Sequence, residues 1–117
     1  MMTKEEHIEY WLKTAKEDWE TAQFLFQSKR YVYSLFFTHL TLEKTLKALW
    51  VRDNDGSIPP KTHNLVKLIQ ATNASLTDEQ IGFLLQFNDF QLEGRYPDYK
   101  FEIHRRCDHD YSLTLLN

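Results

Sequence analysis

Three side chains able to carry or move charge recur at every fourth position of a stretch that is otherwise rich in apolar residues. These are His39, Glu43 and Lys47. Residues four apart lie on one face of a helix, so the three groups form one polar line, with Lys44 beside it. Burying an ionised group costs on the order of several kcal/mol unless it is paired. We therefore expect that the line either is satisfied by neighbouring helices or faces a cleft that binds an anion.

The element that carries this line is the predicted central helix of the fold. Residues 36–50 contain no Gly or Pro, and apolar side chains surround most of the helix, which is typical of a buried element. We predict that this helix covers residues 31–51. A first helix precedes it, because a capping box at residues 3–6 leads into an apolar stripe that runs from Ile8 to Phe26. The short connection at residues 27–30 makes the two helices antiparallel neighbours.

One carboxylate interrupts the stripe of the first helix. Asp18 lies between Ala15 and Ala22, and we expect Lys44 or Lys47 of the central helix to pair with it. In the alternative, Asp18 lies in water at the edge of the stripe.

The second half of the chain predicts further helices. Turn-forming residues and two prolines break the chain at residues 52–60. A short helix is expected over residues 63–69, with Thr62 as its N-cap, and a second capping box at residues 77–80 opens a fourth helix that ends at Gly94. Apolar side chains spaced four apart predict a fifth helix from about Lys100 to Leu116. No segment alternates like a strand, so we predict an all-α fold, an up-and-down bundle of four to five helices in a single domain over residues 1–117.

Composition excludes several classes of protein. Fourteen basic and 17 acidic residues are interspersed and give a net charge of −3, which argues against a general binder of the nucleic-acid backbone. No apolar run approaches the roughly 20 residues that span a bilayer, and the first residues lack the order of a signal peptide. We expect a cytoplasmic protein without a membrane segment. Cys107 is the only cysteine, and phosphate-binding glycine loops are absent from the sequence, so no metal or cofactor is expected.

A second polar group follows the predicted end of the fourth helix. Arg95, Tyr96 and Asp98 surround Pro97. They either clamp the turn, with Arg95 on the terminal carbonyls of the helix, or face the polar line and complete an anion pocket. His104, Asp108 and His109 share a face only loosely, so we interpret them as a solvated helix surface rather than a metal site.

Four pieces of the sequence together resemble the HEPN domain family. They are Trp11 with Ala15, Asp18 and Ala22; residues 31–50 with the polar line; residues 60–65 with His63; and residues 95–98. The resemblance covers nearly the whole chain. It implies a helical bundle that is commonly dimeric and often encoded beside a small nucleotidyltransferase, and it is associated with nucleotide binding or with RNA cleavage that needs no metal.

The resemblance also implies which positions bind a ligand. The candidates are His39, Glu43, Lys44, Lys47, His63, Arg95, Tyr96 and Asp98. The ribonuclease motif of the family, an Arg followed after four to six residues by a His, is not matched. Eight residues separate Arg95 from His104, and the same number separates Arg30 from His39. Arg95 and His104 are the catalytic candidates that remain.

Three hypotheses follow. In the first, the chain is a homodimeric, non-enzymatic module that binds a nucleotide or another phosphate-containing ligand and acts with a nucleotidyltransferase partner in a toxin-antitoxin-like pair. In the second, it is a metal-independent ribonuclease toxin, with RNA as its substrate. In the third, the polar line only fixes the register of the helices, and the protein is a structural dimerisation module.

Overall fold

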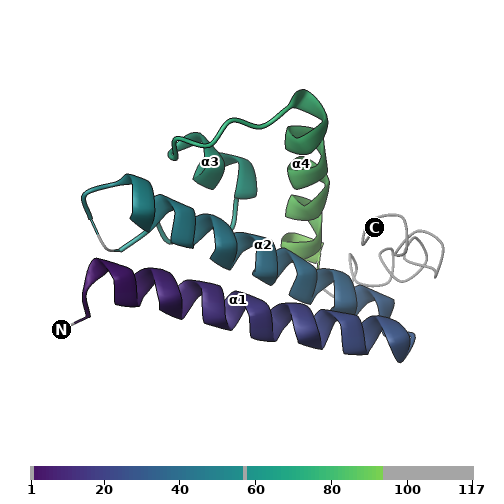
Figure 1. Ribbon diagram of the computed structural model, residues 1–117. Coiled ribbons are helices and arrows are strands. Elements are labelled where there is room, and N and C mark those ends of the chain that lie inside the picture. The colour runs from purple at the N-terminus through teal and green to yellow at the C-terminus, as the bar shows by residue number, and fades with distance from the viewer. Residues whose placement is uncertain (1, 57, 94–117) are drawn as a thin grey trace.

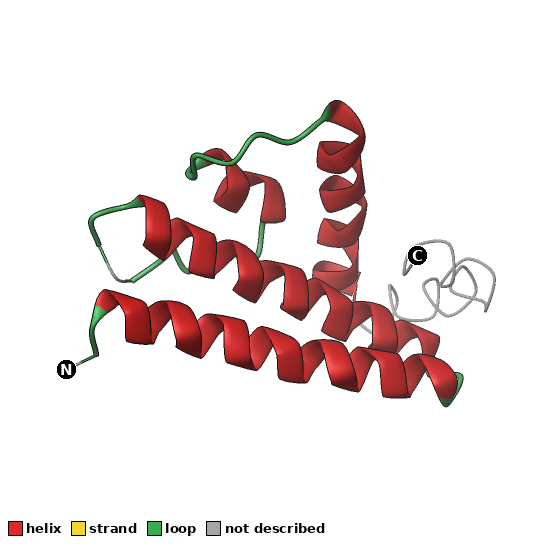
Figure 2. Ribbon diagram, in the orientation of Figure 1, coloured by secondary structure: helices red, strands yellow, loops and turns green. Residues whose placement is uncertain are grey.

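The computed structural model describes residues 2–56 and 58–93, and every element in these residues is helical. The helices are α1 (Lys4–Gln27), α2 (Tyr31–Asp53), α3 (Leu65–Gln70) and α4 (Asp78–Glu93), joined by loops without strand pairing (Figures 1 and 2). The prediction of an all-α fold is confirmed. The predicted fifth helix, and with it Arg95, Tyr96, Asp98 and His104, lies outside the described residues.

Helices α1 and α2 form the predicted antiparallel pair, and both ends of α1 are closed by local hydrogen bonds. The Thr3 hydroxyl accepts a hydrogen bond from the Glu6 amide while the Glu6 side chain binds the Thr3 amide, so the predicted capping box is confirmed. At the other end, Lys29 adopts a left-handed backbone with φ of 63°. The Lys29 amide donates to the Phe26 carbonyl and the Arg30 amide to the Leu25 carbonyl, which is the Schellman arrangement.

Helix α2 is the centre of the molecule. Helix α1 packs along one side of it, and α3 and α4 pack on the other side, with α4 crossing α2 steeply in Figure 1. Small residues allow α1 to approach closely, since Ala15, Ala22, Ser34 and Ala48 are all buried. The Ser34 hydroxyl donates a 2.7 Å hydrogen bond to the Ala22 carbonyl across this contact.

The apolar core lies between α2, α3 and α4. Its buried members are Val32, Leu35, Leu46, Leu65, Leu68, Ile69, Leu84 and Phe87. Burying side chains of this kind stabilises a fold by about 1.5–3 kcal/mol each. The core therefore holds the short helix α3, which could not persist alone at six residues.

The start of α3 differs from the sequence prediction. The N-cap is Asn64 and not Thr62, because the Asn64 carboxamide oxygen accepts from both the Lys67 amide and the Asn88 side chain. Asn88 of α4 also accepts from the Leu65 amide at 2.9 Å. The helix thus begins two residues later than predicted and leaves His63 in the loop before the cap. The capping box that opens α4 is confirmed between Thr77 and Gln80.

Two side chains at the end of α2 tie the α3–α4 loop to it. The Asp53 carboxylate accepts from the Asn73 amide at 2.8 Å, and the Asn54 side chain donates to the Ala71 carbonyl. A hydrogen bond from Arg52, followed by the one from the Asn73 amide, lowers the pKa of Asp53 to about 2. None of the helices in the described ranges is long and apolar enough to cross a membrane.

Candidate functional site

The polar line of α2 forms a charge network centred on Glu43. Lys47 Nζ donates to Glu43 Oε2 at 3.0 Å, and His63 Nδ1 lies 2.7 Å from Glu43 Oε1. Glu43 and Lys47 are buried, with 5% and 8% of their surface exposed. A buried carboxylate is stable only with such partners. The Glu43 carboxylate therefore joins α2 to the segment before α3.

His39 completes the network from the preceding turn of α2. Its Nε2 lies 3.1 Å from the His63 carbonyl oxygen, and since a carbonyl only accepts, Nε2 carries the proton and donates. Its Nδ1 is buried without a hydrogen bond in the described residues, 3.9 Å from Glu43 Oε1. Burial lowers the pKa of His39 below 6.5 and outweighs the opposing effect of Glu43, so the ring is neutral at pH 7.

Two contacts attach the network helix to α1. Lys47 Nζ lies 5.4 Å from the centre of the Trp11 ring, in the range of a cation–π interaction. Lys44 Nζ lies 2.6 Å from Asp18 Oδ2, an ion pair rather than an aligned hydrogen bond. The expected partner of Asp18 is therefore Lys44. Both lysines of the predicted anion pocket are neutralised by carboxylates of the chain itself.

Within the described residues, the predicted ligand residues separate into a group engaged inside the fold and one residue at the surface. Glu43, His39 and Lys47 are brought together, but they are buried and bind one another, while Lys44 is engaged with α1. His63 is the member that reaches the surface, with 43% of its side chain exposed. Ligand binding by all these residues stays a prediction. For the described residues, geometry places His63 where a ligand could touch it.

Sequence reasoning missed a hollow beside the network. It measures about 390 Å³ and is lined by Met2, His7, Tyr10, Trp11, Ile58 and Pro59. The Tyr10 and Trp11 rings lie 5.3 Å apart at 56° and form a corner. The sequence signal that indicates it is the adjacent aromatic pair Tyr10 and Trp11, of which only Trp11 belongs to the apolar stripe.

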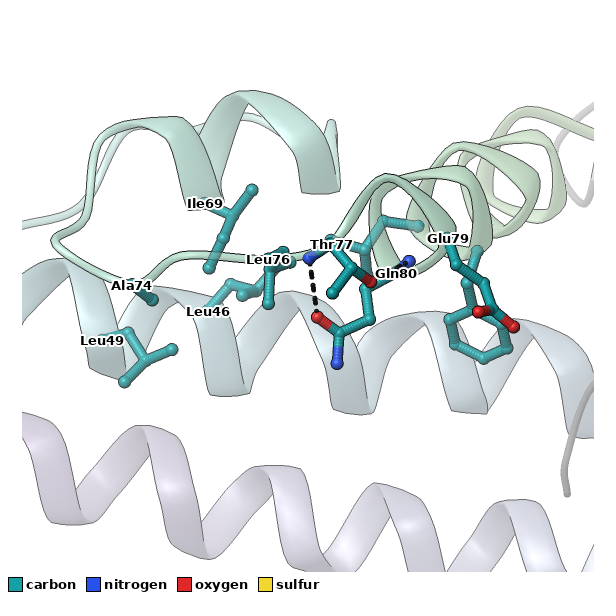
Figure 3. A pocket seen from close by; sticks show the side chains of 10 residues that line it. Leu46, Leu49, Ile69, Ala74, Leu76, Thr77, Glu79 and Gln80 are labelled. Carbon is teal, nitrogen blue, oxygen red and sulfur yellow. Dashed lines mark hydrogen bonds between the residues drawn. The ribbon is translucent and has the colours of Figure 1, made fainter.

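A larger groove lies between α2 and the start of α4 (Figure 3). It measures about 720 Å³, and its walls are mostly aliphatic or aromatic, including Leu46, Leu49 and Phe83. Figure 3 shows the Gln80 carboxamide bound to the Thr77 amide and the Glu79 carboxylate beside the groove. Among the described residues that line it, Glu79 is the only ionisable one. The groove therefore offers apolar contact but no pair of groups suited to acid-base chemistry.

Metal chemistry has no support in the described ranges, where His, Cys, Asp and Glu form no cluster of three that could hold an ion.

Comparison with known proteins agrees with the resemblance drawn from the motifs. The family model of the HEPN domain matches residues 8–116, which is nearly the whole chain. No curated protein and no solved structure matches the chain. The match begins within α1 and includes the Glu43 network, and the chain belongs to the HEPN domain family.

Proposed function

We propose that this HEPN domain is a non-enzymatic module that binds a nucleotide or another phosphate-containing ligand at His63. The observation that carries the proposal is the pairing of a part-exposed imidazole with a buried carboxylate 2.7 Å away. A buried carboxylate on one ring nitrogen fixes the orientation of a histidine. An imidazole N–H donates hydrogen bonds to phosphate oxygens.

The cost of the network supports a role beyond packing. A buried ion pair is often no more stabilising than apolar residues of the same volume. Glu43 and Lys47 nevertheless lie in the centre of the molecule, next to the apolar core. The Glu43–Lys47 pair orients the His63 ring at the surface, which a leucine and a methionine at these positions could not do.

Assembly belongs to the same proposal. We infer from the family resemblance that the module acts as a homodimer beside a nucleotidyltransferase partner, in a toxin-antitoxin-like pair. Arg95, Tyr96 and Asp98 are the further ligand residues of this proposal, by their match to the family pattern.

Calorimetric titration tests the proposal. ATP, GTP and a dinucleotide are titrated into the wild type, His63→Ala and Lys13→Ala, the last being a control that removes an exposed positive charge from α1. We expect His63→Ala to weaken binding about tenfold, equivalent to about 1.4 kcal/mol, and Lys13→Ala to change it less than about twofold. Absence of heat with the wild type, or equal heat with His63→Ala, overturns the proposal.

The competing function is a purely structural network, and one observation favours it: Glu43 and Lys47 are buried and paired within one chain. The double variant Glu43→Leu/Lys47→Met separates the two. If stability and oligomeric state survive while nucleotide binding is lost, the network serves the ligand. If stability or oligomeric state is lost while nucleotide binding survives, the network is structural alone.

A further inference from the structure

The hollow beside α1 has the size and walls of a site for a flat ring. Its volume of about 390 Å³ falls within the range of roughly 300–1,000 Å³ typical of small-molecule sites. Tyr10 is half exposed there, and Pro59 is a buried part of the wall. Because the Tyr10 and Trp11 rings meet at 56°, a planar ligand can stack on one ring and meet the edge of the other.

A continuous chain of contacts joins this hollow to His63. The Trp11 ring holds Lys47 Nζ at 5.4 Å, Lys47 binds Glu43 at 3.0 Å, and Glu43 binds His63 at 2.7 Å. Pro59 and His63 are also four residues apart in the sequence, so their Cα atoms lie within about 14 Å of each other. One ligand that contacts both places has to span a separation of this order.

We propose that this hollow binds the base of the nucleotide whose phosphates lie at His63. The inference rests on the proposed function and assigns it a second subsite. A base fits because the walls are mostly aromatic and apolar, with no carboxylate, lysine or arginine among the described lining residues. Stacking on aromatic rings needs no formal charge on the ligand. The part of the ligand in the hollow needs no negative charge, because the nearby Lys47 is already paired with Glu43.

Titration with the two halves of the ligand tests the subsite. Adenosine, tripolyphosphate and ATP are titrated into Tyr10→Ala, Tyr10→Phe and Phe24→Ala, where Phe24 is an exposed aromatic residue near the far end of α1. We expect Tyr10→Ala to weaken adenosine and ATP about tenfold and to leave tripolyphosphate unchanged. Tyr10→Phe keeps the ring and restores the affinity, and Phe24→Ala has no effect.

The outcomes separate this inference from the proposed function. If ATP binding depends on His63 while adenosine does not bind, the base subsite is overturned and the phosphate site stands. If adenosine binding depends on Tyr10 while tripolyphosphate gives no heat, the hollow stands and the phosphate site at His63 fails. Equal weakening of adenosine and tripolyphosphate by Tyr10→Ala overturns the inference, because the ring would then act on the whole fold.

Discussion

Replacing Glu43 by leucine should destabilise the protein more than any other single change in the network. The substitution leaves the Lys47 ammonium buried, with 8% of the residue exposed, and removes its 3.0 Å ion pair. Breaking a buried pair in this way costs about 3–5 kcal/mol. The Trp11 ring still attracts the ammonium, by about 0.5–2 kcal/mol. We therefore expect the free energy of unfolding to fall by about 3 kcal/mol, the lower end of that range.

Replacing Lys47 should lower the free energy of unfolding by less than replacing Glu43, and replacing both residues should lower it least. In Lys47→Met the Glu43 carboxylate keeps its 2.7 Å contact with His63 and is not left without a partner, so the expected loss is about 1–2 kcal/mol. In Glu43→Leu/Lys47→Met both charges are replaced by apolar groups of similar size. Such replacements are often neutral, and we expect a change below about 1 kcal/mol. The coupling energy of the double-mutant cycle is then about 3–5 kcal/mol.

Urea unfolding followed by far-ultraviolet circular dichroism measures all four proteins. Glu20→Leu, an exposed carboxylate of α1, is the matched control and should change stability by less than about 0.5 kcal/mol. A loss below about 1 kcal/mol in Glu43→Leu, or a double variant whose loss equals that of the two single variants combined, would refute the reasoning.

Three further predictions concern single residues. Stability should fall as the pH drops below 6.5 towards the lowered pKa of folded His39, because the unfolded chain takes up that proton first, and His39→Gln should flatten this part of a urea-unfolding pH series. Lys29→Gly should raise the melting temperature by relieving a left-handed backbone, a gain of about 1 kcal/mol; a decrease would contradict this. Ser34→Ala should cost about 1 kcal/mol in urea unfolding by removing the buried bond to Ala22, and an unchanged midpoint would argue against it.

The long helices could be predicted because their signals are local. The capping box at Thr3 and the periodic stripe that follows set α1, and the uninterrupted run without Gly or Pro sets α2. The start of α3 could not be predicted in this way. Thr62 and Asn64 are both suitable N-cap residues, so the local pattern allows either start. The structure uses Asn64, whose side chain also accepts from Asn88, 24 residues further on, and no local pattern contains that contact.

This boundary decides the geometry of the site. Inside a helix, the His63 carbonyl would be directed along the axis towards the residue four positions on. Because the helix begins later, that carbonyl accepts from His39 and the His63 ring turns to Glu43. Sequence reasoning identified His39, Glu43, Lys47 and His63 as polar positions. It could not show that the α2 members face inward, since helical periodicity does not distinguish a polar line in a cleft from one that is paired inside the fold.

The placement of α1 and of the α3–α4 pair on opposite sides of α2 has a consequence for motion. Contacts of α1 fall chiefly on α2, while the main apolar cluster lies on the other side. Detachment of α1 would leave that cluster closed. The amides of α1 should therefore exchange with deuterium at a lower opening free energy than the amides of α2. A ligand that bridges Tyr10 on α1 and His63 before α3 would couple the two layers and slow this exchange.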